Sequence, residues 1–379
     1  MMSASPATAW NWLRTGDEMF AAMEAAIETA NSSIALESYI YSPTGPGLRL
    51  REALTRATRR GVRVRVLCDA LGSYSLPGDF WSPLQASGGE ARVFNPISLN
   101  RLGIRNHRKL LVCDGQVAFV GGFNVAPEYE GDGVTRGWCD LGLQLTGPLA
   151  SELASSFDEM FARADFQHKR LVRLRRSVTK RQIAGPEQTL LLSGPGRGRN
   201  PIQRALLHDL HHARQVSIIV PYFLPSRAFR RAITRVARRG GSVRLLLPAK
   251  TDVALSRLAT QSLYRRLLRA GVEIYEYQPQ VLHAKLFVVE GVAYIGSSNL
   301  DPRSLRINYE LMLRFANAAL VREAQTIFNE ALARAQRVEL DTWQSSRSLW
   351  TRLKQRWAYY VLARLDPFIA RRQWRALPD

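Results

Sequence analysis

The sequence is poor in lysine, histidine and cysteine, and it lacks long apolar runs. Its 379 residues contain six lysines, six histidines and three cysteines, against forty-seven arginines. Three scattered cysteines, Cys68, Cys113 and Cys139, exclude a disulfide framework and indicate a reducing compartment. No stretch approaches the roughly 18 apolar residues that a membrane-spanning helix needs. Residues 1–12 lack the charged and apolar regions of a signal peptide, so we expect a soluble or peripheral protein.

The scarcity of histidine and lysine makes one repeated pattern stand out. A lysine follows a histidine by two places twice, whereas chance gives about 0.1 such pairs (6 × 6/379). After each pair come an apolar run, an acid, and an asparagine that follows a glycine turn. The residues are His107, Lys109, Asp114 and Asn124 in the first copy, and His283, Lys285, Glu290 and Asn299 in the second. Such self-similarity indicates an internal repeat.

The order of predicted elements around the two copies also repeats. Residues 1–32 have a helical pattern, and the hydrophobic pattern then predicts strands at 33–41, 62–67 and 141–145 and helices at 50–60 and 149–164. In the second half it predicts strands at 216–220 and 243–247 and a helix at 228–239. Alternating strands and helices predict an α/β fold of two halves that form a pseudo-dimer, each half a mixed β-sheet flanked by helices.

Composition shifts divide the chain into four segments. They are a first half at 1–165, a basic linker at 166–200, a second half at 201–338 and a basic amphipathic tail at 339–379. The linker is either solvated or attracted to anionic lipid. The first half also carries a seven-residue insertion, with Arg101 and Arg105, just before His107.

The tail has the pattern of a helix that lies in a membrane interface. One helical face carries Trp350, Leu353, Trp357, Tyr360 and Val361, and basic residues lie mostly off that face. Apolar residues continue beyond it at Phe368, Ile369 and Trp374. The alternative is a C-terminal helix that docks on the protein's own core.

The net charge of +21 and the pI of about 10.7 point to a polyanionic partner. Nucleic acid and an anionic membrane surface both fit this charge. A general compositional bias toward arginine and alanine is the alternative cause.

The repeated pattern resembles the phospholipase D superfamily, whose members carry two H-x-K-x4-D motifs. Within that superfamily, N-H-R-K at residues 106–109, G-G-x-N at 121–124 and G-S-S-N-L-D-x-R-S at 296–304 are similar to bacterial cardiolipin synthases. The resemblance covers roughly residues 20–335 and implies the same two-half fold. It also implies an acid that orients each histidine, matched by Asp140, 33 residues after His107, and Glu310, 27 residues after His283.

The residue types in the motif suit metal-free phosphodiester transfer. One histidine can attack phosphorus and form a phosphohistidine, and the other can protonate the leaving alcohol. Lys109 and Lys285 can hold the non-bridging oxygens, with Asn124 and Asn299 as hydrogen-bond donors. Family behaviour suggests His107 as the nucleophile, although the symmetry of the motifs leaves the order open.

Several further residues are candidates of lesser weight. By the family motif, Asp114 and Glu290 are counted with the histidines and lysines as catalytic candidates. Because Glu290 stands where the motif has aspartate, we interpret this acid as structural rather than as a group that acts on the proton. Glu37 is a polar candidate on the first strand, and Arg303 and Ser304 can shape the pocket after Asp301. His208, Asp209, His211 and His212 form a candidate metal cluster, although no further ligands converge in sequence. The three cysteines are expected in the core.

These observations together predict an enzyme of the cardiolipin synthase type. It would move a phosphatidyl group from phosphatidylglycerol to a second phosphatidylglycerol, with no cofactor and no metal, at the cytoplasmic side of the cell membrane. The expected partner is an anionic phospholipid surface, with nucleic acid disfavoured and no obligate protein partner. The alternatives are a hydrolytic phospholipase D or phosphodiesterase/nuclease, and an inert lipid- or nucleic-acid-binding module.

Overall fold

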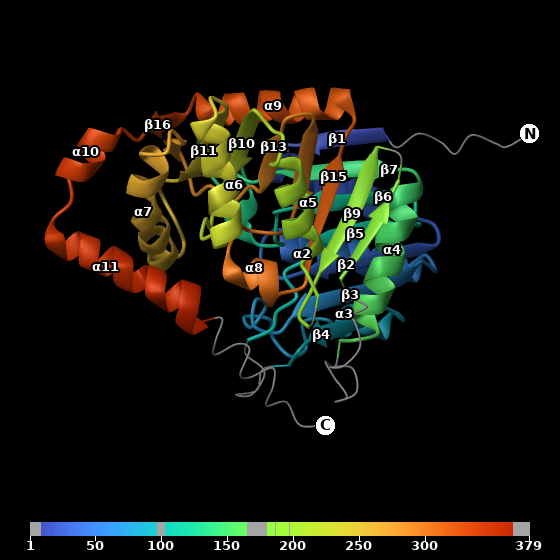
Figure 1. Ribbon diagram of the computed structural model, residues 1–379. Coiled ribbons are helices and arrows are strands. Elements are labelled where there is room, and N and C mark those ends of the chain that lie inside the picture. Colours follow the sequence, from blue (N-terminus) through green and yellow to red (C-terminus); the bar gives the residue numbers. More distant parts are fainter. Residues whose placement is uncertain (1–8, 97–102, 165–179, 186, 197, 367–379) are drawn as a thin grey trace, which may run out of the picture. The chain divides into compact units, whose positions relative to one another are not determined.

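A computed structural model describes residues 9–96, 103–164, 180–185, 187–196 and 198–366. The chain divides into two compact units, Met1–Lys169 and Arg170–Pro378. Each unit is built around one β-sheet (Figure 1).

The first unit contains a seven-stranded sheet with the order β1-β7-β6-β5-β2-β3-β4. Its strands are β1 (Ala9–Leu13), β2 (Ser33–Ser38), β3 (Arg63–Asp69), β4 (Glu90–Phe94), β5 (Leu110–Cys113), β6 (Val117–Gly121) and β7 (Gly142–Thr146). Its helices are α1 (Gly16–Thr29), α2 (Pro46–Arg59), α3 (Ser82–Ala86) and α4 (Pro148–Phe161). Strands β2, β3 and β4 are parallel, and the other neighbours pair antiparallel, so the sheet is mixed.

Side chains alternate between the two faces of this sheet, and helices cover both faces. Ile34 and Leu36 of β2 join the core cluster that α1 and α2 build with Phe20 and Leu54. Residues of opposite orientation face α4, where Arg65 pairs with Asp158 at 2.6 Å. The sheet is therefore covered on both sides, as the predicted α/β class requires.

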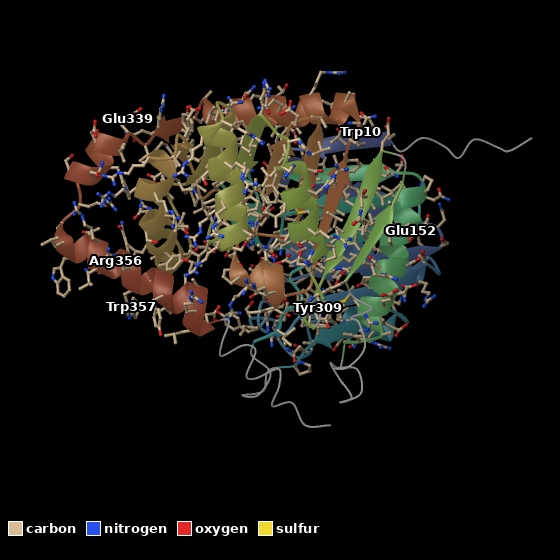
Figure 2. All side chains as sticks on the ribbon, in the orientation of Figure 1. Trp10, Glu152, Tyr309, Glu339, Arg356 and Trp357 are labelled. Carbon is tan, nitrogen blue, oxygen red and sulfur yellow. The ribbon has the colours of Figure 1, made fainter. Side chains whose placement is uncertain are left out.

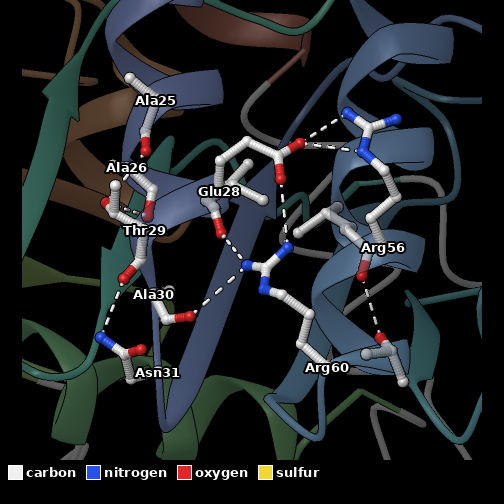
Figure 3. Close-up of polar contacts among 11 residues, drawn as sticks. Ala25, Ala26, Glu28, Thr29, Ala30, Asn31, Arg56 and Arg60 are labelled. Atoms are coloured by element: carbon white, nitrogen blue, oxygen red, sulfur yellow. Dashed lines mark hydrogen bonds and ion pairs between the residues drawn. The ribbon is translucent and has the colours of Figure 1, made fainter.

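Exposed ion pairs connect α1 with α2 (Figure 3). The Glu28 carboxylate meets Arg56 Nη2 at 2.6 Å and Arg60 Nη1 at 3.1 Å. Arg60 also donates to the Ile27 carbonyl at 2.9 Å. Because all three side chains are partly exposed, each ion pair contributes at most about 1 kcal/mol, and the apolar core dominates this helix contact.

The second unit contains a nine-stranded sheet with the order β16-β12-β11-β10-β13-β14-β15-β9-β8. Its strands are β8 (Arg181–Ala184), β9 (Gln188–Ser193), β10 (Gln215–Ile219), β11 (Ser242–Pro248), β12 (Glu273–Tyr277), β13 (Leu286–Val289), β14 (Val292–Gly296), β15 (Glu310–Phe315) and β16 (Ala335–Arg337). Its helices are α5 (Pro201–Asp209), α6 (Arg227–Arg238), α7 (Ala254–Leu268), α8 (Pro302–Arg306), α9 (Ala318–Leu332), α10 (Leu340–Ser345) and α11 (Leu349–Tyr360).

The two sheets repeat one another strand by strand. The run β9-β15-β14-β13-β10-β11-β12 of the second sheet has the same order and the same parallel and antiparallel pairings as β1-β7-β6-β5-β2-β3-β4 of the first. This repetition confirms the predicted fold class of two mixed-sheet halves. The second sheet gains β8 and β16 at its edges.

Two sequence expectations differ from the structure at equivalent places. Residues 9–13, expected within a helix, form β1, and residues 181–184 and 188–193, expected within a linker, form β8 and β9. Strand β1 pairs with β7 and β9 pairs with β15, each more than a hundred residues further along the chain. Such short strands are defined by distant partners rather than by a local hydrophobic period. Most of the basic run of the expected linker, at 165–179, lies outside the described residues.

Helix α11 lies against α7 at the end of the described chain (Figure 1). Gln355 and Ala358 are its buried residues, whereas Trp350 and Trp357 are 69% and 61% exposed. Its N-cap Ser348 accepts a hydrogen bond from the Thr351 N–H at 3.2 Å. The helix thus docks on the protein by one side and leaves the predicted apolar face in solvent. Phe368, Ile369 and Trp374 lie outside the described residues.

No helix in the described ranges is both long enough and apolar enough to cross a bilayer.

Candidate active site

The first motif lies at one edge of the first sheet. His107 and Lys109 immediately precede β5, which runs antiparallel to both β2 and β6. The start of β5 therefore meets the ends of β2 and β6 and the start of β7. Those positions carry Tyr39, Asn124 and Asp140. We call these five residues the first histidine edge.

His107 and Lys109 are buried there beside an aromatic ring. The Tyr39 and His107 rings meet edge-on with centroids 5.0 Å apart, and Lys109 Nζ lies 5.3 Å from the Tyr39 ring centre. Lys109 Nζ also donates to the His107 carbonyl oxygen at 2.8 Å. Tyr39 was not recognised from the sequence, although it lies within the strand predicted at 33–41, two residues after Glu37.

Asp140 reaches this edge because Gly122 has no side chain. A Cβ atom at Gly122 would lie 2.0 Å from Asp140 Oδ1, so only glycine leaves room for the carboxyl group. The same oxygen accepts a hydrogen bond from the Leu141 N–H at 2.8 Å. Asp140 is 3% exposed. The absence of a side chain at Gly122 therefore determines where the Asp140 carboxyl group can lie.

Asn124 ties two strand ends together. Its Oδ1 accepts from the Ile40 N–H at 3.1 Å, and its Nδ2 donates to the Tyr129 hydroxyl at 2.6 Å. Both contacts are with protein groups, so the side chain is held rigidly at the edge. Because one Nδ2 hydrogen is donated to Tyr129, the expected role of Asn124 as a phosphate ligand requires the second Nδ2 hydrogen.

The second motif lies at the equivalent edge of the second sheet. His283 and Lys285 precede β13, and Asn299 and Glu310 stand at the end of β14 and the start of β15. Tyr222 approaches His283 with ring centroids 6.5 Å apart. We call these five residues the second histidine edge.

Contacts within the second histidine edge are tight. Lys285 Nζ lies 2.8 Å from His283 Nδ1, and it also donates to the His283 carbonyl oxygen. Ser297, at the place of Gly122, donates to Glu310 Oε2 at 2.5 Å. Asn299 is 3% exposed, and its Oδ1 has no hydrogen-bond partner among the described residues. The Ser297 hydroxyl thus holds Glu310 in the second edge, whereas in the first edge Gly122 leaves space for Asp140.

The motif acids Asp114 and Glu290 do not join these edges. Each follows the far end of its strand, four residues beyond the strand's start, which places it about 13–16 Å from the lysine. Asp114 accepts hydrogen bonds from the N–H groups of Asn31, Ser32 and Ser33 at 2.8–2.9 Å. Burial opposes ionisation of Asp114, but these hydrogen bonds lower its pKa. They therefore hold the strand end rather than a substrate.

Glu290 makes the equivalent contacts in the second unit. Its Oε2 accepts from the N–H groups of Arg214 and Gln215 at 2.8 and 3.0 Å. Both acids have a positive φ, 55° at Asp114 and 51° at Glu290. The structural role expected for Glu290 therefore applies to both positions, and the longer side chain still reaches the backbone.

A buried polar network supports the first motif. Glu37 Oε1 accepts from Asn106 Nδ2 at 2.6 Å, and Glu37 Oε2 lies 3.1 Å from Arg108 Nη2. Asp69 accepts from the Asn106 N–H at 2.9 Å and pairs with Arg105 at 3.3 Å. Burial raises the pKa of Glu37, although Arg108 and Asn106 oppose that effect. Both neighbours of His107 in the chain are thus anchored by one carboxylate.

In the described ranges, no such polar network lies beneath the second motif. Glu37 pairs with Leu110 as Ile219 pairs with Leu286, so Ile219 is the counterpart of Glu37. Leu282 and Ala284 flank His283, where Asn106 and Arg108 flank His107. The two histidine edges therefore carry the same functional groups, but the residues packed beneath them are polar in the first unit and apolar in the second. Arg101 of the expected insertion lies outside the described residues.

Three of the remaining candidates, Asp209, Asp301 and Arg303, have structural partners. Asp209, of the possible metal cluster, accepts from Arg314 Nε at 2.8 Å and from the Tyr294 hydroxyl. Asp301 caps α8 by accepting from the Ser304 N–H at 2.8 Å. Arg303 pairs with Asp366 at 2.5 Å.

The cysteines are free thiols in the first unit. Cys68 and Cys113 are buried, and Cys139 is partly buried. Burial raises the pKa of Cys113 to about 12 and that of Cys68 further, so neither forms a reactive thiolate near neutral pH.

Each histidine edge thus gathers a buried histidine, a lysine, an asparagine and an acid on one sheet edge. A histidine can act as nucleophile or as acid and base, and a lysine can neutralise phosphoryl oxygens. Two such edges on two copies of one fold define a phosphodiester-transferring protein of the phospholipase D type.

Comparison with known proteins identifies the family. The family profile described as "Cardiolipin synthase, PLD-like domain" matches residues 23–163 and 206–332. Cardiolipin synthase 1 of Bacillus cereus is 31% identical over 363 residues, covering 92% of this chain and 71% of the relative. The major cardiolipin synthase ClsA of Bacillus subtilis is 32% identical over 351 residues, covering 90% and 72%. This chain belongs to the cardiolipin synthase family with phospholipase D-like domains.

Solved structures show the same fold. The phosphatidylserine synthase of Haemophilus influenzae superposes with a TM-score of 0.75 and covers 95% of this chain and 94% of that chain, at 14% identity. The polyphosphate kinase of Porphyromonas gingivalis gives a TM-score of 0.59 and covers 88% and 49%, also at 14% identity. At these identities the likeness concerns the fold alone, and it confirms the predicted fold class.

Proposed function

We propose that this protein is a phosphatidyltransferase of the cardiolipin synthase type. The supporting observation is the pair of histidine edges with matched His, Lys, Asn and acid, together with about 31% identity to cardiolipin synthases over most of the chain. The donor and the acceptor are both phosphatidylglycerol, and the product released with cardiolipin is glycerol.

The reaction proceeds in two displacements at phosphorus. A ring nitrogen of His107 attacks phosphorus, the P–O bond to glycerol breaks, and His283 gives a proton to the departing oxygen. His283 then takes a proton from a hydroxyl of the second phosphatidylglycerol, whose oxygen attacks phosphorus and breaks the P–N bond. Lys109 and Lys285 neutralise the non-bridging oxygens during both steps.

Asp140 and Glu310 orient the two histidines in this scheme. Both carboxyl groups are almost fully buried, and each stands on the same sheet edge as its histidine. An acid that accepts from one ring nitrogen fixes the tautomer and leaves the other nitrogen available for phosphorus or for a proton. Asn124 and Asn299 donate to the phosphoryl oxygens. Asp114 and Glu290 act on stability through the strand ends.

The enzyme works at an anionic phospholipid surface, to which it binds peripherally on the cytoplasmic side. Support comes from the net charge of +21 and from the outer side of α11. Leu349, Trp350, Leu353, Trp357 and Tyr360 of that helix are 55–81% exposed. Tryptophan side chains next to basic residues favour the boundary between head groups and acyl chains.

The direct test uses purified protein, vesicles with isotopically labelled phosphatidylglycerol, and mass spectrometry of the lipids. The expected products are cardiolipin and glycerol, absent with folded His107→Ala and His283→Ala proteins. Retained transfer in His107→Ala would refute the nucleophile assignment. Phosphatidic acid as the sole product would identify water as the acceptor and a hydrolytic phospholipase D instead.

A further inference from the structure

A cavity lined by arginines lies between α6, α7 and α11 of the second unit. Its volume is about 480 Å³. Its wall contains the arginines Arg227, Arg230, Arg231, Arg266, Arg356 and Arg364. Neither histidine edge contributes a residue to this wall, so the cavity is separate from the residues assigned to catalysis.

Among the described residues, no carboxylate lines this cavity, although Asp301 lines the adjoining hollow that shares Arg227, Arg230 and Arg364 with it. Within the described part of the chain, none of the six arginines forms an ion pair. Elsewhere in the protein, arginines such as Arg56, Arg303 and Arg314 are paired with carboxylates. Like charges that share one hollow repel each other, and a bound anion would relieve this repulsion.

The fold brings these arginines together by ordinary helix geometry. Arg227, Arg230 and Arg231 occupy positions i, i+3 and i+4 of α6, on one side of that helix. The opposite side buries Phe229 and Ile233 in the core. The arginines therefore converge because their helix has a single apolar face to bury.

One contact attaches α11 to this wall. Arg230 Nη2 lies 3.2 Å from the Tyr359 hydroxyl oxygen, and the guanidinium stands over the Tyr359 ring at 5.7 Å. Arg356 then points from α11 beside Trp357, which is exposed (Figure 2). A basic hollow and an apolar, solvent-facing helix side thus share one element.

A second arginine-lined hollow lies along the same helix. Arg265, Arg347 and Arg352 line it together with Trp350 and Leu353, and its volume is about 920 Å³. Burial, with the nearby charges of Arg352 and Arg265, lowers the pKa of Arg347. Because Ser262 and Arg356 line both hollows, the positive charge continues along α11 from one hollow to the next.

The chemistry of the wall selects a phosphate group as ligand. A guanidinium offers two parallel N–H donors that match two phosphate oxygens, and arginine serves phosphate recognition better than a point charge does. The exposed tryptophan and leucine side chains of α11 next to the cavity favour contact with acyl chains over contact with water. A phosphodiester with attached apolar chains satisfies both parts.

We propose that the cavity between α6, α7 and α11 binds the phosphate of an anionic phospholipid that does not react. Such a lipid would hold the enzyme on the membrane while other lipids turn over at the histidine edges. The proposal rests on the proposed function only in requiring that the protein works at a phospholipid surface.

The test compares two variants from which the same charge has been removed. The cavity variant is Arg227→Gln/Arg231→Gln/Arg266→Gln. The control variant, Arg235→Gln/Arg238→Gln/Arg269→Gln, changes exposed arginines outside the cavity, two in α6 and one at the C-cap of α7. Both lose equal long-range attraction to an anionic surface, so the difference between them reports the cavity.

Binding is measured by sedimentation with phosphatidylcholine vesicles that contain 30% phosphatidylglycerol or none. The cavity variant should bind the anionic vesicles at least tenfold more weakly than the control variant, and both should bind neutral vesicles equally. Equal weakening of the two variants would overturn the site. A version with Arg→Lys at the three cavity positions should fall between wild type and the Gln variant, because charge remains and paired donation is lost.

Two further measurements separate this proposal from others. Turnover of short-chain, soluble phosphatidylglycerol should be the same in the cavity variant and in wild type. If wild type itself fails to turn lipid over, the proposed function falls while the binding comparison still decides the site. Thermal stabilisation of wild type by inorganic phosphate to the same extent as by anionic vesicles would overturn the lipid as the ligand.

Discussion

Replacing Glu37 by isoleucine should destabilise the first unit strongly. Glu37 is fully buried, and its carboxylate neutralises Arg108, whose side chain is 4% exposed. Taking away one member of a buried ion pair leaves the other charge without compensation, at a cost of about 3–5 kcal/mol. Asn106 loses its 2.6 Å acceptor as well. For a unit of this size, that loss corresponds to a fall in Tm of about 6–20 °C.

The second unit supplies the compensating changes. Its counterparts of Glu37, Asn106 and Arg108 are Ile219, Leu282 and Ala284, all apolar. The triple variant Glu37→Ile/Asn106→Leu/Arg108→Ala should therefore recover at least half of the stability lost by Glu37→Ile, because Arg108 is removed together with its partner and is no longer buried without compensation.

Urea unfolding followed by tryptophan fluorescence measures both effects, and transfer activity is measured on the same samples. A loss below about 1 kcal/mol in Glu37→Ile, or a triple variant no more stable than the single one, would refute the reasoning. A folded triple variant with strongly reduced kcat shows that the network also positions His107.

Three further outcomes follow from single contacts. Gly122→Ala should lower kcat at least tenfold, because the new Cβ would lie 2.0 Å from Asp140 Oδ1, whereas Gly78→Ala, with open space around it, should leave activity unchanged. Asp114→Asn should cost about 1–3 kcal/mol of stability near neutral pH with little change in kcat, and the depressed pKa makes the wild-type advantage vanish as the pH falls through it. Burial raises the pKa of Asp301 from 3.8 to about 6, so the folded state keeps this proton to a higher pH than the unfolded state does. The free energy of unfolding should therefore lose about 1–3 kcal/mol as the pH rises from 4 to 6, and Asp301→Asn should remove this contribution from a calorimetric pH series while those of Glu37 and Asp69 remain.

Much of the site could be predicted from the sequence because its main residues are rare and repeated. His107 and Lys109 stand directly before a four-residue apolar strand, and their copies stand before another. Strand pairing then places the motif residues on one edge, so spacing along the chain indicates closeness in space. The family and the fold class, both predicted on this basis, are confirmed by the comparisons.

Features that depend on distant pairing could not be predicted. Strands β1 and β9 were missed because each is short and is completed by a strand far along the chain. The partnership of Glu37 with Asn106 and Arg108 joins positions about seventy residues apart and depends on the register of β2 against β5. Tyr39 and Tyr222 were missed because no local pattern separates them from core tyrosines.

The position of the last motif residue also bears on how such chains are detected. Asp114 and Glu290 directly follow the strands that Lys109 and Lys285 precede. Both carboxylates accept hydrogen bonds from backbone N–H groups, although the Glu290 side chain is one methylene longer. A search pattern that demands aspartate there would discard the second copy of this protein and would count it as a chain with one motif. A pattern built on folded geometry would instead fix the histidine, the lysine and the acid two strands away, and would let the strand-terminating acid vary in length.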